Sequence, residues 1–240
     1  MSPKLLFAGL VAGAASLAGC KPQADRPSRD DTANDTAKDT ANDSDGACPA
    51  GSVGIADFCI DAFEAQAAGD LGNRDQGLNF PDGSTRAQAS SQAGVSPTEH
   101  ITYYQAFGVC AASGRHLCTV DEWQAACGAG TYPWGESPDA VTVCAIAKSD
   151  GSTSWTSVQP TGALADCASS AGVYDQIGNL WEWADPGLQD ADGRPITAKL
   201  GGAWYAGNAD AACNLPAHDE HPPDFDGSIG FRCCSPAGPA

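Results

Sequence analysis

The sequence predicts an α+β domain with little regular secondary structure and many disulfide bonds. Two helix-start signals stand close together near the middle of the chain, and the remaining apolar segments are short and separated by long Gly- and Ser-rich connections. The chain of 240 residues also contains 28 glycines and 11 cysteines. Helices followed by short strands and long loops are typical of the α+β class.

Residues 1–19 have the pattern of a signal peptide. One cation, Lys4, precedes an apolar run from Leu5 to Leu17, which is shorter than the ~20 apolar residues that a membrane-spanning helix needs. The next residues, Leu17-Ala18-Gly19-Cys20, resemble the lipobox of bacterial lipoproteins, in which cleavage exposes a cysteine that is then lipidated. We therefore predict lipidation of Cys20, and Lys21 in the following position favours an outer-membrane anchor, with the protein facing either the periplasm or the cell exterior. A plain secretory signal is the alternative.

Residues 20–46 are predicted to be an acidic linker. They consist mainly of Pro, Asp, Thr, Ala and Asn, and they contain a four-residue repeat that begins at Asp31, Asp35 and Asp39. Because almost no large apolar side chain is available to offset the entropy of ordering, we predict a disordered, extended tether. A metal-binding acidic tail is the alternative, although aspartates four residues apart in a flexible chain make no preformed site. Residues 47–240 have the size of one domain.

The charge of the chain limits its partners. The formal net charge is −18, so no basic patch is expected that could displace counterions from nucleic acid. The same charge disfavours electrostatic docking on anionic lipid. We therefore predict no nucleic-acid partner, and membrane attachment through the N-terminal lipid alone.

The folded part begins with a predicted strand and continues through two predicted helices. Residues 55–64 alternate apolar and polar side chains in part, and residues 65–94 are predicted to be a long irregular connection. Thr102 with Gln105, and Thr119 with Glu122, form capping boxes that start two consecutive helices. Gly114 is placed to end the first helix in a left-handed conformation. The side chains expected to face the core are Tyr103, Phe107 and Cys110 in the first helix and Trp123, Ala126 and Cys127 in the second.

Ten cysteines remain once Cys20 is set aside, and an even number in an exported chain indicates a disulfide framework. Spacing alone leaves the connectivity open. Zinc ligation is the alternative, and the absence of a Cys-x2-Cys pair disfavours it.

Six motifs occur in order between about Cys48 and Cys234 and resemble those of one family. They are Phe58-Cys-Ile-Asp-Ala-Phe-Glu64, Gly114-Arg-His-Leu-Cys-Thr-Val-Asp-Glu-Trp123, Tyr132-Pro-Trp-Gly135, Gly178-Asn-Leu-Trp-Glu-Trp183, Gly201-Gly-Ala-Trp204 and Gly230-Phe-Arg-Cys233. They resemble the formylglycine-generating enzyme family, also called the sulfatase-modifying factor family, which has "FxIDxYE", "GKRLPTEAEWE" and "YPWG" in the first three places. The resemblance implies that family's variant of the C-type lectin fold.

The resemblance narrows the disulfide pairing. It implies the bridges Cys110–Cys233 and Cys127–Cys213, because the matching family cysteines are joined in this way. Among the cysteines that are left, Cys48 and Cys59 flank a turn, Cys144 and Cys167 bracket a Ser- and Gly-rich loop, and Cys118 then pairs with Cys234.

The resemblance also implies one calcium site. The family segment that matches residues 175–182 holds Ca²⁺ with two side chains and two backbone carbonyls. Carried over residue by residue, the ligands are the side chains of Asp175 and Glu182 and the carbonyl oxygens of Gly178 and Leu180, a hard-oxygen set that suits Ca²⁺. A structural Trp-rich turn is the alternative. The family's second calcium loop departs further, with Ala145 in place of its leading Asn, and it is not carried over.

The family's oxidase centre is predicted to be missing. Its enzymes hold copper with two cysteines after the Gly-Gly, and those positions are Ala206 and Ala211 here. Copper(I) requires soft thiolates, which alanine does not supply, so copper is not expected. Ala203 also replaces the serine that follows Gly-Gly in the enzymes. A shifted alignment with Cys213 as a lone reactive thiol is the alternative.

A third candidate is the segment His218-Asp-Glu-His221, with Asp224 and Asp226 after it. Two histidines with nearby carboxylates could bind a divalent metal, whereas a solvated acidic loop is the plainer interpretation. The same segment could line a ligand cleft with Trp204 and Tyr205. His116 is expected to be a surface or packing residue, and no nucleophile elbow occurs.

We therefore expect a tethered, calcium-stabilised, non-catalytic domain that binds a peptide, a protein or a glycan in this cleft. The alternative is an oxidoreductase of the same family that oxidises a protein cysteine with oxygen through a different set of residues, such as a metal held by His218 and His221.

Overall fold

The computed structural model describes residues 48–136, 143–147, 152, 154–207, 210–222 and 224–238. The predicted signal peptide, the lipidation site at Cys20 and the predicted linker lie outside the described residues. Within those ranges, no helix combines the length and the apolar character needed to cross a membrane.

Helix α1 (Tyr103–Ala112) begins and ends where its sequence signals predict. Thr102 Oγ1 accepts a hydrogen bond from the backbone N–H of Gln105 at 3.2 Å, and the Gln105 side chain accepts one from the backbone N–H of Thr102 at 3.3 Å. Gly114 has φ of +71°, which glycine adopts without steric cost. The chain therefore turns sharply after α1 and enters the next element at once.

Helix α2 (Val120–Cys127) starts at the second predicted capping box. The N–H of Glu122 donates to Thr119 Oγ1 at 3.2 Å, and the N–H of Thr119 donates to Glu122 Oε2 at 2.9 Å. His116 is half-buried, and its Nε2 lies 3.0 Å from both carboxylate oxygens of Glu122. The predicted inward residues of α2 are buried, as are Tyr103 and Cys110 of α1.

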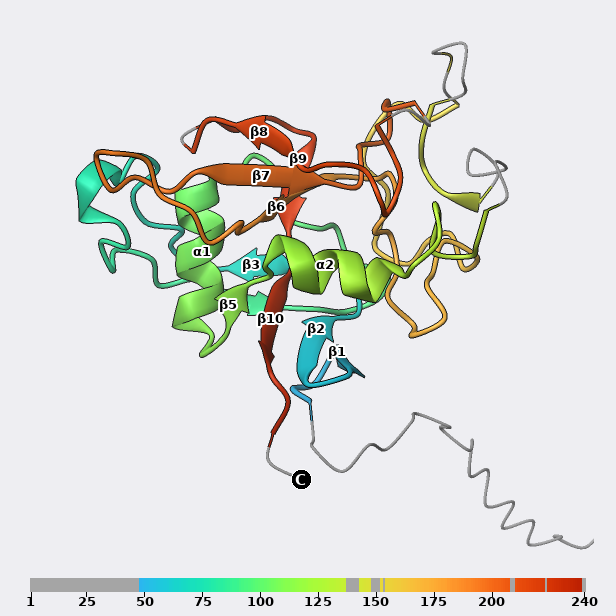
Figure 1. Ribbon diagram of the computed structural model, residues 1–240, viewed down its shortest axis with the longest axis horizontal. Coiled ribbons are helices and arrows are strands. Elements are labelled where there is room, and N and C mark those ends of the chain that lie inside the picture. The colour runs from blue at the N-terminus through green and yellow to red at the C-terminus, as the bar shows by residue number, and fades with distance from the viewer. Residues whose placement is uncertain are drawn as a thin grey trace, which may run out of the picture. The chain divides into compact units, whose positions relative to one another are not determined.

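A four-stranded sheet contains strands from both ends of the domain. Its first two strands differ from one prediction. Residues 55–64 are not one strand, because Ala56, with φ of +51°, turns the chain between two strands. The C-terminal strand then pairs with strands from two distant parts of the chain, as Figure 1 shows. In spatial order the strands are β1 (Ser52–Ile55), β2 (Phe58–Asp61), β10 (Cys233–Pro236) and β5 (His116–Leu117), all antiparallel.

A second four-stranded sheet carries the candidate site. Its central strand β6 pairs antiparallel with β7 and parallel with β9. Trp183 of β6 donates from its indole N–H to the carbonyl of Ile101 at 2.8 Å, which ties the sheet to the start of α1. In spatial order the strands are β8 (His218–Glu220), β7 (Thr197–Leu200), β6 (Trp181–Ala184) and β9 (Ile229–Phe231).

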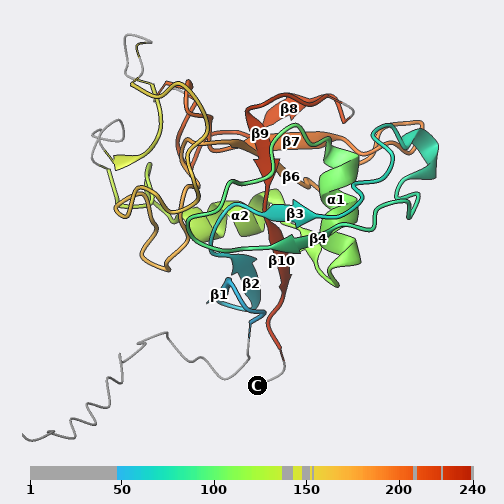
Figure 2. The ribbon, with the colours of Figure 1, turned by 180° about the vertical axis from the view of Figure 1, so that it is seen from behind.

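The predicted irregular connection over residues 65–94 contains more structure than expected. Strands β3 (Gln66–Ala68) and β4 (Gln88–Ser90) pair as an antiparallel ribbon, and a single 3₁₀ turn, η1 (Gly77–Asn79), lies between them. The ribbon lies against α1, which Figure 2 shows from behind. Part of the predicted irregular connection is therefore a two-stranded ribbon that packs beside α1.

Two large groups of buried side chains form most of the core. One surrounds α1 and includes Trp183 and Phe231, and the other surrounds α2 and includes Trp123 and Ile177. Five disulfides cross-link this core. They are Cys48–Cys59, Cys110–Cys233, Cys118–Cys234, Cys127–Cys213 and Cys144–Cys167, the five expected pairs.

Candidate functional site

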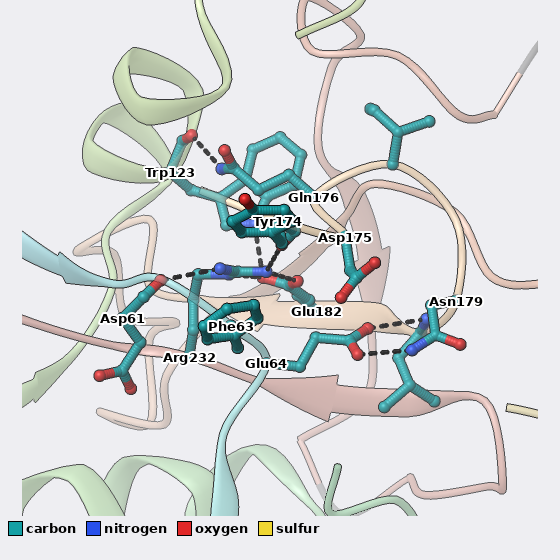
Figure 3. Close-up of polar contacts among 12 residues, drawn as sticks. Asp61, Phe63, Glu64, Trp123, Tyr174, Asp175, Gln176, Asn179, Glu182 and Arg232 are labelled. Atoms are coloured by element: carbon teal, nitrogen blue, oxygen red, sulfur yellow. Dashed lines mark hydrogen bonds and ion pairs between the residues drawn. The ribbon is translucent and has the colours of Figure 1, made fainter. Parts of the chain in front are cut away.

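A buried ion pair lies at the centre of the candidate site. Arg232 follows β9 and is fully buried, and Glu182 is the second residue of β6 and is also buried. The guanidinium donates from Nε to Glu182 Oε2 and from Nη2 to Glu182 Oε1, both at 2.6 Å. It also donates to the backbone carbonyls of Asp61 at 2.8 Å and Tyr174 at 2.9 Å (Figure 3). One side chain therefore joins β2, β6 and the segment before the Gly-Asn-Leu-Trp motif.

Two further buried carboxyl groups lie beside this pair. Glu64 accepts hydrogen bonds from Asn179 Nδ2 at 2.6 Å and from the backbone N–H of Leu180 at 3.1 Å. Burial raises the pKa of Glu64 well above its usual value, and the charges of Asp175 and Glu182 raise it further. The site thus places three carboxyl groups around one guanidinium.

Asp175 occupies a strained but well-held position. Its φ is +59°, a conformation that aspartate and asparagine tolerate better than most residues. Oδ2 accepts a hydrogen bond from the backbone N–H of Gly162 at 2.6 Å. Burial raises the pKa of Asp175 to about 6, against the hydrogen bond from Gly162 and the charge of Arg232, which lower it.

These residues fit the implied calcium ion poorly. Both oxygens of Glu182 already accept hydrogen bonds from Arg232, and Oε2 also accepts one from Trp123 Nε1 at 2.7 Å. Within the described ranges, no three His, Cys, Asp or Glu side chains are grouped so that they could hold a metal ion. Calcium at Asp175, Gly178, Leu180 and Glu182 stays a prediction from the sequence.

The two predicted copper positions come together in the structure. Gly202 has φ of +75°, and a β-carbon built on it would lie 3.0 Å from the β-carbons of both Ala206 and Ala211. Both alanines are buried, Ala206 with the side chains around α1 and Ala211 with those around α2. The place where two thiolates would converge therefore contains two methyl groups. Cys213 is bonded to Cys127, so the alternative of a lone reactive Cys213 finds no support.

The third predicted site is only partly described. His221 is exposed and pairs with Asp224, Nδ1 to Oδ2 at 3.5 Å, as a solvated loop would. The backbone of His218 lies in β8, and its side chain is outside the described residues.

Of the predicted cleft residues, Trp204 is half-buried and Tyr205 is 47% exposed. Their rings meet edge to face at 5.1 Å. The Tyr205 hydroxyl lies 2.9 Å from Ser228 Oγ, which connects it to the loop before β9.

The sequence interpretation missed three residues that build this site. Glu64, Asn179 and Arg232 each belong to a motif that was recognised, yet none was assigned a role. The signal that could have identified them is a charged or amide residue at a fixed place within an otherwise apolar motif. Such a residue, once buried, requires a partner.

Comparison with known proteins agrees with this architecture. The family model described as "Sulfatase-modifying factor enzyme 1-like domain" matches residues 30–237. The protein named "Inactive C-alpha-formylglycine-generating enzyme 2" from Bos taurus is 30% identical over 156 residues, which are 59% of this chain and 51% of that protein. "Formylglycine-generating enzyme" from Mycobacterium tuberculosis is 32% identical over 98 residues, 36% of this chain and 32% of that protein. The chain spans about half the length of the inactive relatives that it matches.

Solved structures support the fold alone. "Structure of PvdO from Pseudomonas aeruginosa" superposes with a TM-score of 0.51 at 16% identity, covering 75% of this chain and 80% of that one. The structure titled "Crystal Structure of CarF" superposes with a TM-score of 0.50 over 75% of this chain and 86% of that one, also at 16% identity. With its C-type lectin-like fold and with the family match over most of its length, this chain belongs to the sulfatase-modifying factor family.

Proposed function

We propose that this protein is a non-catalytic member of its family. It binds a ligand and does not oxidise a cysteine. One observation carries the proposal: Ala206 and Ala211 converge beside Gly202 where the enzymes have two copper-binding cysteines. All ten cysteines within the described residues are in disulfides, so no thiol in this part of the chain replaces them. The relatives whose names call them inactive support the same interpretation.

The ligand is proposed to be a peptide, a protein or a glycan. Support comes from the aromatic pair at Trp204 and Tyr205. The ring of Tyr205 is partly exposed and amphipathic, and it directly precedes Ala206, one of the two positions where the enzymes have copper-binding cysteines. Such rings bury a large area at low entropic cost when they contact a partner. We further propose that the domain is displayed on a tether from a lipid attached to Cys20, which a Cys20→Ser variant would test through loss of lipid labelling.

The decisive experiment is an oxidation assay. The purified full chain is supplied with Cu(I), oxygen, a thiol reductant that provides the two electrons, and a Cys-x-Pro-x-Arg peptide, and the peptide mass is followed. An active family member treated in parallel is the positive control. We expect the cysteine to stay unconverted. Formation of formylglycine above the level of a protein-free reaction would refute the proposal.

A further inference from the structure

The large apolar side chains that are exposed in the described part of the chain gather in one region. Tyr205 contacts Ser228 through its hydroxyl, and the other four lie on three loops near the start of α1. Their exposed fractions are 65% for Leu78, 57% for Leu188, 40% for Ile196, 47% for Tyr205 and 42% for Phe225. Scattered exposed apolar residues are ordinary on protein surfaces, but a gathering in one region marks an interaction site.

Two of the three loops meet directly at the start of α1. Thr102, the N-cap, donates from its hydroxyl to the carbonyl of Arg74 at 3.2 Å, and the N–H of Tyr103 donates to the carbonyl of Pro222 at 3.1 Å. The guanidinium of Arg74 lies 4.0 Å from the centre of the Phe225 ring. The loop of residues 70–83 is therefore in contact with Phe225, and Pro222 contacts the start of α1 beside it.

The third loop, residues 185–196, connects β6 to β7 and lies next to the other two loops. It leads into β7, and Thr197 of β7 is paired with Glu220 of β8, directly before residues 221–228. Figures 1 and 2 both show this loop beside residues 70–83, at the same end of the domain. Burial raises the pKa of Tyr104, the charges of Asp75 and Asp190 raise it further, and the charge of Arg194 lowers it, so all three charged groups lie within electrostatic reach of this one side chain. We call the surface formed by residues 70–83, 185–196, 221–222 and 224–228 the α1 rim.

The α1 rim is acidic as well as apolar. Only Arg74 and Arg194 are exposed cations among its residues. Seven of its aspartates are exposed, namely Asp70, Asp75, Asp82, Asp190, Asp192, Asp224 and Asp226. Apolar side chains among unbalanced negative charges attract a partner of opposite charge that also has apolar side chains.

We propose that the α1 rim binds a cationic polypeptide segment that carries aromatic or aliphatic side chains. Leu78, Leu188 and Phe225 would bury apolar area against those side chains, while the aspartates would increase the rate of encounter. An anionic membrane or a nucleic acid is repelled by the same charges. This inference rests on the proposed binding function and names the class of partner and the surface that recognises it.

The test uses a phage-displayed library of random dodecapeptides, selected on the immobilised full chain. We expect the selected peptides to carry a net positive charge and at least one aromatic or large aliphatic residue, relative to the unselected library. Absence of enrichment, or enrichment of neutral or anionic peptides, would overturn the proposal. Binding of glycans or of anionic vesicles in place of cationic peptides would overturn it too.

Variants assign the binding to this surface. An apolar variant combines Leu78→Ser, Leu188→Ser, Ile196→Thr and Phe225→Ser, and a charge variant combines Asp75→Asn, Asp192→Asn and Asp224→Asn. The matched control, Asp57→Asn with Asp121→Asn and Asp166→Asn, removes three exposed charges elsewhere. We expect the apolar variant to bind the selected peptides about tenfold or more weakly, as loss of interface anchors does. The charge variant should bind more slowly and with less dependence on salt.

Circular dichroism and thermal unfolding verify that the variants remain folded, which is expected because the substituted side chains are exposed. Equal binding by the wild type and the apolar variant would overturn the proposal. That outcome leaves the oxidation assay unaffected, so failure of this surface and failure of the non-catalytic function can be told apart.

Discussion

Arg232 and Glu182 form a fully buried, two-pronged ion pair, with both N–H···O distances at 2.6 Å. Glu64 and Asp175 also lie within the electrostatic reach of the guanidinium. The pair thus holds together segments that are 50 residues apart in the chain. Loss of Arg232 would affect more than one contact, because the carboxyl groups of Glu64, Asp175 and Glu182 would have no cation beside them.

Arg232→Met is expected to destabilise the domain more than Glu182→Gln. Breaking a buried pair from one side typically costs about 3–5 kcal/mol, and loss of the arginine leaves three carboxyl groups close together. Urea unfolding at pH 7 measures the free energy of unfolding of each variant. Arg194→Met, an exposed arginine, is the control and should stay within about 0.5 kcal/mol of the wild type. A larger loss for Glu182→Gln than for Arg232→Met would contradict the expectation.

The capping box of α2 should make stability depend on pH. Burial alone would raise the pKa of Glu122, but hydrogen bonds from His116 and Thr119 together lower it below its usual value of 4.5. A lowered pKa in the folded state adds stability above the unfolded value, and this stability is lost as the pH falls through the folded pKa. Glu122→Gln keeps the cap, as Gln105 does in α1. We therefore expect the two proteins to differ in unfolding free energy at pH 7 and to converge as the pH falls through the lowered folded-state pKa of Glu122. A constant difference at all pH values would disprove the linkage.

The disulfides should contribute differently to the free energy of unfolding, according to the length of the loop that each closes. Cys110–Cys233 closes a separation of 123 residues and Cys48–Cys59 one of 11. The bridges Cys118–Cys234 and Cys127–Cys213 already close parts of the long loop, so both variants are made in a background that lacks Cys118–Cys234. There Cys110–Cys233 closes a loop made of residues 110–127 and 213–233, about 38 residues, for which the chain-entropy relation gives about 4 kcal/mol, against about 3 kcal/mol for Cys48–Cys59. Paired Cys→Ala variants, compared by denaturant unfolding, test this order. Equal losses would mean that structure remaining in the unfolded chain, rather than loop length, sets the contribution.

Thermal unfolding with and without calcium tests the implied ion. Since Glu182 is committed to Arg232 and Trp123, we expect the same unfolding temperature in excess calcium and in a chelator. Asp175→Asn, which retains an acceptor for Gly162, should behave in the same way. A calcium-dependent rise in the wild type that Asp175→Asn abolishes would instead establish the site predicted from the sequence.

Restoring the two thiols should restore copper binding without any change in the fold. We expect the double variant Ala206→Cys, Ala211→Cys to bind about one Cu(I) per chain, because two converging thiolates suit that ion. The wild type and each single variant should bind none, as measured by competition with a coloured Cu(I) chelator. The added atoms lie near Gly202, so some loss of stability, about 1–3 kcal/mol, is expected from overpacking. Equal copper binding by the wild type would contradict the assignment.

Local signals predicted local structure well. The capping boxes at Thr102 and Thr119 and the turn at Gly114 were readable because the atoms that make them lie within a few residues. The hairpin at Ala56 was misread as one strand, since a non-glycine residue with positive φ gives no turn signal. Strands β3 and β4 were missed because Gln, Ala and Ser have low strand propensity, and their pairing is decided by packing on α1.

The candidate site was only half predictable. The positions of Ala206 and Ala211 follow from the resemblance, and the structure brings them together. The partnership of Glu182 with Arg232 could not be read from spacing. It arises because β6 and β9 run parallel, so that residues 50 apart in the chain share one buried environment.

The central place of β10 in its sheet has a consequence for biosynthesis. Residues 229–236 provide β9 and β10, the guanidinium at the centre of the candidate site, and one half of two disulfides. A ribosome makes β10 after β2 and β5, so these two strands have no strand between them until residues 233–236 have been synthesised. A chain that stops before residue 229 lacks an edge strand of one large sheet, an inner strand of the other, and Arg232. The final packing of both sheets therefore waits for the synthesis of this short segment.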